Sequence, residues 1–355
     1  MSKLRVAVLF GGQSTEHEVS VMSARNVVKA IDGGRYEIVP ILIDRGGRWL
    51  LVEEKGGVLL PEPIAYEGTE VCLVPGGKGR LLALEGAGAR ELPAVDMLFP
   101  VLHGLNGEDG SIQGLAQIVG LPLVGCGILG SANAIDKDMA KRLLREAGLP
   151  VACSVTLVRG GKPDFDEIVS ALGSPVFVKP TRQGSSVGVS KVQDAEAFET
   201  ALAEAFRHDR KVLVEEFVRA REIEYAVLEQ PDGTLFVSVP GEIATAATHG
   251  FYSYEAKYLD QHGAVVTVPA DIPAETAEMM KRMAAEGFRA LGCEGLARVD
   301  FFLAPDQSVV INEINTMPGF TNISMYPKAM DASGISYSEL ISRLIEHGLA
   351  RAQQD

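Results

Sequence analysis

The strongest constraint on the fold is a regular alternation of strand-like and helical segments at the start of the chain. Apolar runs at 4–10 (LRVAVLF) and 37–44 (EIVPILID) flank a helical pattern at about 16–31, and a third apolar run, VDMLFPVLH, ends at His103. Strands that alternate with helices in this way form a parallel sheet that is covered by helices. We therefore expect residues 1–130 to form an N-terminal α/β domain.

The chain of 355 residues is too long for one ordinary core. A second unit is expected at 131–214, where the helical pattern ANAIDKDMAKRLLREAG opens a further α/β stretch. A third is expected at 215–355, where strands are followed by helices, as is typical of α+β domains. Glycine-punctuated stretches between 45 and 91 are expected to add hairpins to the first domain.

Composition excludes several classes of function. A formal net charge of −14 argues against binding to nucleic acid or to an anionic membrane surface. The chain has no run of about 18 apolar residues that could cross a bilayer. The cysteines lack C-x-x-C spacing, so neither a disulfide framework nor a zinc site is expected. We expect a cytoplasmic protein whose partners are small molecules.

The segment at 125–130 reads G-x-G-x-x-G, the pattern of a dinucleotide-binding turn. A dinucleotide fold needs this turn after its first strand and an acidic residue about 20 positions later to hold the ribose. Here the turn lies late in the chain, and LPVACSVTLVRG follows it without an acidic residue. We therefore expect a tight glycine turn, with Ser131 as the N-cap of the next helix.

Polar residues follow two of the N-terminal strands. The first strand leads into GGQSTEHEVS, and open α/β sheets bind ligands at the carboxyl ends of their strands. Glu16 and Glu18 in the first turn of the helix either favour the helix dipole or grip a ligand ammonium group, and the sequence leaves both readings open. His103 ends another strand before GLNGEDG and is expected to be functional.

Lys179 lies inside the apolar strand PVFVKP and precedes the loop TRQGSSVG. The backbone amides of 184–187 are suited to cover phosphates while Lys179 supplies a positive charge. A flexible hairpin loop would explain the glycines but not the lysine, which is costly to bury without an anionic partner.

The segment ARVDFFLAPDQSVVINEIN places acidic residues on two neighbouring strands. If Ala304 pairs with Val309, Asp300 lies opposite Glu313, with Asn315 within reach on the same face. Two carboxylates and an amide oxygen suit magnesium that carries nucleotide phosphates. A salt bridge from Arg298 to one of the carboxylates is the structural alternative.

Together these motifs resemble those of the D-alanine--D-alanine ligases, an ATP-grasp family. The resemblance runs in the family's order from GGQSTEHEVS through HGLNGEDGSIQG, KPTRQGSSVGVSKV and LVEEFVRAREIE to FYSYEAKYLD, RVDFFL and NEINTMPGFTNISMYP. It implies a Rossmann-like (pre-ATP-grasp) parallel-sheet domain followed by two α+β ATP-grasp subdomains. It also implies a homodimer that joins two D-alanines through a D-alanyl phosphate, with ADP and phosphate released, for peptidoglycan precursors.

The resemblance further implies how ATP and two Mg²⁺ (or Mn²⁺) ions are held. The metal ligands would be Asp300, Glu313 and Asn315. The ATP-binding residues would be Lys137, Lys179, Ser185, Ser186, Glu215, Glu216, Val218, Glu222 and Lys257.

For the amino acids, the resemblance implies a substrate-binding set and an overlapping catalytic set. Tyr252, Tyr258 and Lys257 lie in a long segment without clear periodicity, which is typical of a lid. The substrate-binding residues would be Glu16, His103, Tyr252, Tyr258, Arg298, Gly319, Ser324 and Met325. The catalytic residues would be Glu16, His103, Ser185, Lys257, Tyr258, Arg298 and Gly319.

Four other functions stay open at this point. Tyr258 favours an amine as the nucleophile, because relatives that make an ester with D-lactate generally have phenylalanine there. The segment SMYP has no arginine to meet a serine hydroxyl, which disfavours D-serine as second substrate. An ATP-grasp ligase for another amino acid pair is a further alternative. A nucleotide-binding regulatory protein without turnover would be expected to lose Asp300, Glu313 or Asn315.

Overall fold

The computed structural model describes residues 3–60, 67–161, 163–245 and 264–354. Its first sheet has seven strands in the order β8-β7-β6-β3-β2-β1-β9. Strand β1 pairs in parallel with both β2 and β9, as the alternation predicts, and β2 pairs antiparallel with β3. The strands are β1 (Leu4–Gly11), β2 (Tyr36–Ile43), β3 (Trp49–Leu51), β6 (Thr69–Leu73), β7 (Leu81–Glu85), β8 (Gly88–Leu92) and β9 (Met97–Val101).

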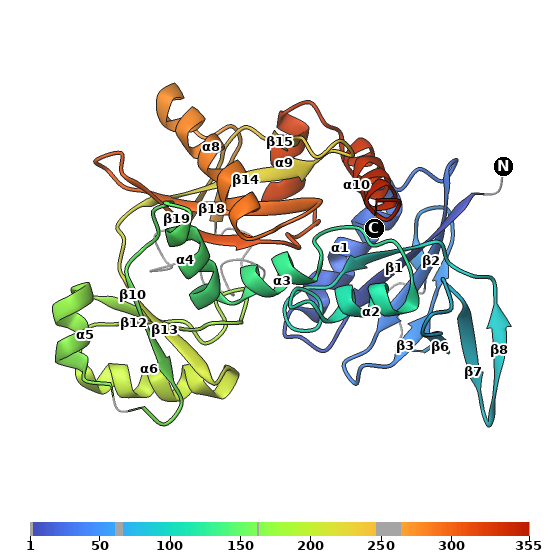
Figure 1. Ribbon diagram of the computed structural model, residues 1–355, viewed down its shortest axis with the longest axis horizontal. Helices are drawn as coiled ribbons and strands as arrows, with labels where there is room; N and C mark the ends of the chain where they lie inside the picture. Colours follow the sequence, from blue (N-terminus) through green and yellow to red (C-terminus); the bar gives the residue numbers. More distant parts are fainter. Residues whose placement is uncertain (1–2, 61–66, 162, 246–263, 355) are drawn as a thin grey trace.

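Helices cover both faces of this sheet because its central strands are apolar on both sides. Alternate residues of β1 pack into two different cores, one with α1 (His17–Ala30) and one with α2 (Ser111–Val119). The first core also contains residues of α9 (Met325–Ala332) and α10 (Tyr337–Arg351) from the end of the chain. Figure 1 shows α10 beside α1, so the last helix completes the first domain.

The segment between 45 and 91 adds antiparallel strands, as expected. It extends the first sheet through β3, β6, β7 and β8, and it forms a separate pair of β4 (Glu53–Glu54) with β5 (Leu59–Leu60).

The second sheet has four strands in the order β10-β13-β11-β12, all antiparallel. Helices α5 (Phe165–Leu172) and α6 (Ala195–His208) pack on it and form its core. Its strands are β10 (Ser154–Val158), β11 (Val176–Pro180), β12 (Ser190–Val192) and β13 (Lys211–Glu216).

The third sheet is also antiparallel and is covered by α8 (Ala274–Ala290). Helices α3 (Ile128–Ile135) and α4 (Lys137–Glu146) contribute to the same core, and in Figure 1 α3 lies between the first domain and α4. Its strands are β14 (Arg221–Glu229), β15 (Leu235–Val237), β16 (Gly241–Thr245), β17 (Ala264–Thr267), β18 (Leu296–Leu303) and β19 (Val309–Asn315).

Two local predictions need correction. Ser131 does not cap a helix: it lies inside α3, whose N-cap is Gly127. The expected single helix is two helices, because Asp136 has extended backbone and caps α4 by accepting hydrogen bonds from the amides of Asp138 and Met139. A residue that competes for backbone amides in this way favours a new helix start over an uninterrupted helix.

The hairpin of β18 and β19 brings Asp300 opposite Glu313, as predicted, but by a different route. Leu303, not Ala304, pairs with Val309, so the register starts one residue off. A β-bulge between Asp300 and Phe301 takes up one extra residue of β19 and restores the pairing.

Candidate active site

Glu16 joins the first sheet to a loop of the second. It directly precedes α1, yet its side chain caps no helix amide; instead its carboxylate accepts a hydrogen bond from the hydroxyl of Ser185. Glu16 is 7% exposed. Glu18 is exposed and pairs with Arg45 at 2.9 Å. Of the two glutamates, only Glu16 therefore points into the space between the first two sheets.

The loop at 181–188 has an unusual backbone at its tip. Ser185 and Ser186 both have positive φ, at 49° and 60°, a conformation that costs a residue with a Cβ about 1 kcal/mol. At Gly184 a Cβ would lie 2.7 Å from Glu16 Oε2, so a side chain at this position would have to displace the carboxylate. Close approach to Glu16 therefore fixes the conformation of the loop that is predicted to cover phosphates.

Lys137 connects this loop to the third sheet. It is the first residue of α4, and its Nζ donates to the carbonyl of Gln183 at 2.9 Å and lies 3.3 Å from Glu313 Oε2. Its side chain is 13% exposed. The lysine thus places a positive charge between the loop and the strand carboxylates.

Lys179 has the anionic partner that its burial demands. Its Nζ lies 2.6 Å from Glu215 Oε2, while a second buried lysine, Lys141, lies 2.5 Å from Glu215 Oε1. Burial alone would raise the pKa of Glu215, but the two ammonium groups more than offset it and lower that pKa. Burial lowers the pKa of Lys141. The three side chains form a buried cluster with one more positive than negative charge, which suits an anionic ligand.

Arg298 lies on β18 between two carboxylates. Its Nε and Nη2 donate to Asp300 at 2.7 and 2.6 Å, and its Nε lies 2.9 Å from Glu224 Oε2 on β14. Burial would lower the pKa of Arg298, but Asp300 and Glu224 raise it well above its usual value. The salt bridge that the sequence left as an alternative is therefore present.

The salt bridge does not use all the oxygen ligands on this face. Glu313 and Asn315 lie opposite Asp300 and Arg298 on β19, and Asn315 Oδ1 accepts only the amide of Met317 in the described part of the chain, at 2.9 Å. Within those residues no cluster of three His, Cys, Asp or Glu side chains is arranged to hold a metal. The donor set of two carboxylates and one amide oxygen nevertheless fits a hard cation such as magnesium.

His103 holds the segment that follows β19. Its Nδ1 lies 3.0 Å from the carbonyl oxygen of Met317, so Nδ1 carries the proton, and Nε2 faces the Ser23 hydroxyl at 3.4 Å. Burial lowers the pKa of His103, which keeps the ring neutral. Ser23 in turn accepts the amide of Phe320 at 3.1 Å. Both ring nitrogens therefore face protein groups, which favours a positioning role for His103.

Glu108 was not singled out from the sequence, yet it lies beside Glu16. Its Oε2 accepts the amide of Gly104 at 2.8 Å, and a Cβ on Gly104 would lie 3.2 Å from Glu16 Oε2. Burial, with a smaller contribution from the charge of Glu16, raises the pKa of Glu108 to about 8. The first domain thus places one buried, protonated carboxyl next to Glu16.

The remaining predicted residues lie at three places. Gly319 and Ser324 are close, since a Cβ on Gly319 would lie 2.8 Å from Ser324 Oγ, and Ser324 precedes α9. Met325 is buried at the start of that helix. Glu215 and Glu216 end β13, Val218 follows it, and Glu222 lies on β14 opposite Ile243. Tyr252, Lys257 and Tyr258, the predicted lid residues, lie outside the described residues.

Three residues near the site were missed: Lys141, Glu108 and Glu224. Lys141 and Lys137 are four residues apart on one helix face, a signal that the sequence carried. Glu108 lies in the motif with His103, but nothing in its spacing indicates burial. Glu224 lies two residues after Glu222 on a strand, and its partner Arg298 is set only by the pairing of β14 with β18.

A domain with a mixed sheet that contains the parallel strands β2, β1 and β9, followed by two α+β units whose lysines and carboxylates meet it at one place, defines an ATP-grasp protein. Sequence comparison agrees: the profile of the D-ala D-ala ligase N-terminus matches residues 5–126, and that of the D-ala D-ala ligase C-terminus matches 143–346. The chain belongs to the D-alanine--D-alanine ligase family.

Individual relatives cover almost the whole chain. D-alanine--D-alanine ligase A of Mesorhizobium japonicum is 60% identical over 351 residues, 98% of either chain. The D-alanine-D-alanine ligase structure from Coxiella burnetii has a TM-score of 0.86 at 36% identity, covering 100% of this chain and 96% of that one. A D-Ala:D-Ser ligase structure from Enterococcus faecalis has a TM-score of 0.85 at 36% identity, covering 98% and 100%.

None of the described helices is both long and apolar enough to span a membrane.

Proposed function

We propose that this enzyme joins two D-alanines to D-alanyl-D-alanine at the expense of ATP, releasing ADP and phosphate. Full-length relatives that are D-alanine--D-alanine ligases support this activity. The observation that carries it in this chain is the hydrogen bond from Ser185 to Glu16. It joins the ligand-binding edge of the first sheet to the loop suited to phosphates, so that an amino acid and a nucleotide can meet there.

The first D-alanine is proposed to bind with its ammonium group at Glu16. Glu16 is buried and close to Gly104 and Gly184, which leave the backbone open around its carboxylate. In the described part of the chain no ion pair is formed by Glu16, and a buried carboxylate of this kind is stabilised by a cationic ligand. His103 positions the segment leading to Gly319, where the backbone amide and Ser324 are proposed to take the carboxylate of the second D-alanine.

ATP is proposed to bind between the second and third sheets. Lys137 and Lys179 orient its phosphates, the loop with Ser185 and Ser186 covers them, and Glu215, Glu216 and Val218 line the adenine, with Glu222 at the ribose. When bound, Mg²⁺ (or Mn²⁺) held by Asp300, Glu313 and Asn315 would neutralise charge on the transferring phosphoryl group. Tyr252, Tyr258 and Lys257 stay predicted members of the site.

The chemistry follows from the poor electrophilicity of a carboxylate. The first D-alanine attacks the γ-phosphate of ATP and becomes an acyl phosphate, which the amine of the second D-alanine then attacks. The tetrahedral oxyanion that results needs a donor. Within the described residues, the contacts of Arg298 with Asp300 and Glu224 are made through Nε and Nη2, and Nη1 is proposed to donate to that oxygen. Loss of phosphate yields the dipeptide.

The first experiment is phosphate release from Mg-ATP with D-alanine, L-alanine, D-serine or D-lactate, together with the mass of the product. We expect release that depends on D-alanine and a D-alanyl-D-alanine product. The similarity to a D-Ala:D-Ser ligase makes D-serine the second candidate for the acceptor, and the D-serine reaction tests it. ATP binding without turnover on any of the four would contradict the ligase and favour a regulatory nucleotide-binding protein.

A matched pair of variants tests the role of Glu16. Glu16→Gln is expected to reduce kcat/KM for D-alanine about a hundredfold, because the ammonium loses its counter-charge. Glu18→Gln, two residues away on the exposed face, is expected to stay near wild type. Equal losses in both variants would point to helix α1 as a whole.

Two further proposals rest on the family resemblance. The enzyme is proposed to be a homodimer that associates through its first domain, which sedimentation of the purified protein tests. It is also proposed to act in the cytoplasm, where ATP is available, and fractionation of cells with an antibody against the enzyme tests this location.

A further inference from the structure

Two buried cysteines that the proposed mechanism does not use lie side by side. Cys126 directly precedes the N-cap of α3, and Cys293 lies in the turn between α8 and β18; they are 3% and 6% exposed. A Cβ on Gly130 would lie 2.6 Å from Cys126 Sγ and 2.8 Å from Cys293 Cα. Both cysteines are free thiols. Residues far apart in the sequence therefore form a dithiol.

The surroundings distinguish the two sulfurs. The buried hydroxyl of Ser131 has no hydrogen-bond partner among the described residues, and its proximity lowers the pKa of Cys126. The Cys293 thiol lowers the pKa of Cys126 against the opposing effects of burial and the Glu294 charge, while the pKa of Cys293 is raised well above its usual value. Cys126 is therefore the better nucleophile.

The backbone around the dithiol is already in close contact. The amide of Gly127 donates to Glu294 Oε2 at 3.0 Å, and a Cβ on Gly295 would lie 3.2 Å from backbone atoms of Gly125. Arg351 of α10 contacts both the Cys126 and the Cys293 segments: it donates to the Gly125 carbonyl at 2.8 Å and lies 3.3 Å from Glu294. Little movement of the main chain is needed to bring the two sulfurs into bonding distance.

We propose that Cys126 and Cys293 are a modification site at which a small hydroperoxide forms a reversible disulfide between the exit of the first domain and the third sheet. The Cys126 thiolate attacks a peroxide oxygen, giving a sulfenic acid and hydroxide with hydrogen peroxide as oxidant. The Cys293 sulfur then displaces the hydroxyl from the Cys126 sulfur, and its proton leaves with it as water. Each disulfide consumes one peroxide and two thiols and forms two waters.

The test treats the full-length protein with hydrogen peroxide and maps its peptides without reduction. We expect a peptide pair linked through Cys126 and Cys293 that has lost two hydrogens and that dithiothreitol restores. A bulky disulfide reagent is expected to react first with the exposed Cys153, because the dithiol is buried and hydrogen peroxide is little larger than water. Cys153→Ser serves as the matched control and should leave the link unchanged.

Cys293→Ser separates the two roles. Without the resolving thiol, Cys126 is expected to accumulate as the sulfenic acid and more oxidised forms, whereas Cys126→Ser should leave Cys293 reduced under the same treatment. Peroxide that oxidises Cys153 while Cys126 and Cys293 of the wild type stay free thiols would overturn the proposal. A link that forms only after denaturation in urea would do the same. These readouts do not use turnover, so they are independent of the proposed ligase activity.

Discussion

Glu215 illustrates how single residues near the site control its charge. A carboxylate that is 3% exposed is expensive to bury alone, and Lys179 and Lys141 each bring it a positive charge from a different element. The cluster keeps one excess positive charge next to the loop that is proposed to hold phosphates. The side chain of Lys141 is itself only 2% exposed, so its role is to neutralise Glu215 next to Lys179.

Lys141→Met therefore is expected to lower the free energy of unfolding by about 2 kcal/mol, because Glu215 loses one of its two cations in a buried site. Urea denaturation measures the change. The control is Lys281→Met on α8, where the lysine is only partly buried and the effect should be within about 0.5 kcal/mol. A Lys141→Met protein as stable as the control would show that Lys179 alone neutralises Glu215.

Glu108 provides a pH dependence at the same scale. Its pKa is raised to about 8 in the folded state, so folding favours the protonated form, and this stabilisation is lost as the pH rises from the unfolded pKa through 8. Glu108→Gln keeps an acceptor for the Gly104 amide but cannot ionise. We expect the melting temperature of Glu108→Gln to exceed that of the wild type by a margin that grows between pH 5 and 8 and then levels off.

Thermal melts across this range check the expectation, with Glu53→Gln at an exposed position as control. A margin that does not change with pH would mean that Glu108 ionises normally in the folded protein.

At the scale of elements, the sequence predicted different features of the loop at 181–188 and of the hairpin of β18 and β19. The hairpin face was predictable because side chains alternate along a strand, and the bulge that corrected the register was not, because it depends on how β19 packs. The residue types of the loop led to the prediction that it covers phosphates. The contact of the loop with Glu16 needed two sheets to meet, which no local pattern specifies. The same holds for the Cys126 and Cys293 pair.

Ser185 tests whether the loop acts through its hydroxyl or its backbone. Ser185→Ala and Ser185→Gly both lose the bond to Glu16, and each is expected to reduce kcat/KM for D-alanine at least about tenfold. Ser185→Gly should be more stable than Ser185→Ala by about 1 kcal/mol, because alanine must adopt the positive φ with a Cβ. Steady-state kinetics and urea melts measure the two effects. Full activity in Ser185→Gly would show that the site needs only the backbone of this loop.

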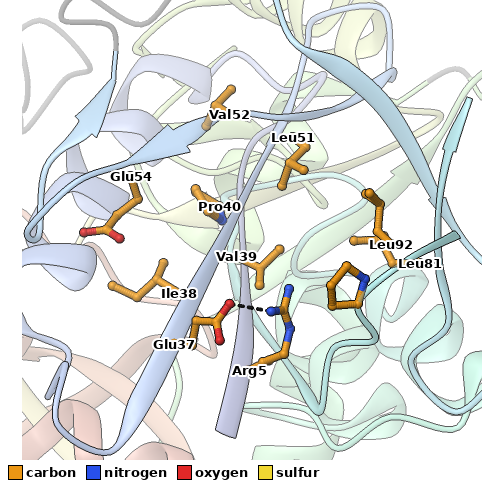
Figure 2. A pocket seen from close by; sticks show the side chains of 11 residues that line it. Arg5, Glu37, Ile38, Val39, Pro40, Leu51, Val52, Glu54, Leu81 and Leu92 are labelled. Atoms are coloured by element: carbon orange, nitrogen blue, oxygen red, sulfur yellow. Dashed lines mark hydrogen bonds and ion pairs between the residues drawn. The ribbon is translucent and has the colours of Figure 1, made fainter. Parts of the chain in front are cut away.

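At the scale of the whole molecule, the end of the chain holds the units together. Helix α10 packs in the core of the first domain beside α1, while α9 before it packs against β14 of the third sheet. The last side chains of α10 then reach the segment that leaves the first domain. The described parts of the three units thus pack together, and the C-terminal helix α10 lies beside α1 of the first domain (Figure 1). A hollow of about 210 Å³ lies between β2 and the added strands and is lined by Val39, Leu81 and Leu92, with the pair of Arg5 and Glu37 at its edge (Figure 2).

Arg351 connects the end of α10 to the segment that leaves the first domain. Its guanidinium donates to the carbonyls of Leu123 and Gly125 at 3.1 and 2.8 Å and lies 3.3 Å from Glu294, with the side chain 18% exposed. Arg351→Gln is expected to lower the free energy of unfolding by about 2 kcal/mol, since buried carbonyls lose a charged donor.

Arg343→Gln on the same helix is the matched control. Arg343 is 36% exposed and pairs only with Glu339 one turn away among the described residues, an arrangement worth about 0.5 kcal/mol or less. If both variants have the same free energy of unfolding within error, α10 is held by its apolar face alone and the Arg351 guanidinium does not contribute to stability. If Arg351→Gln melts earlier and in two steps, the first domain separates from the third sheet before either unfolds, because the arginine is what couples them.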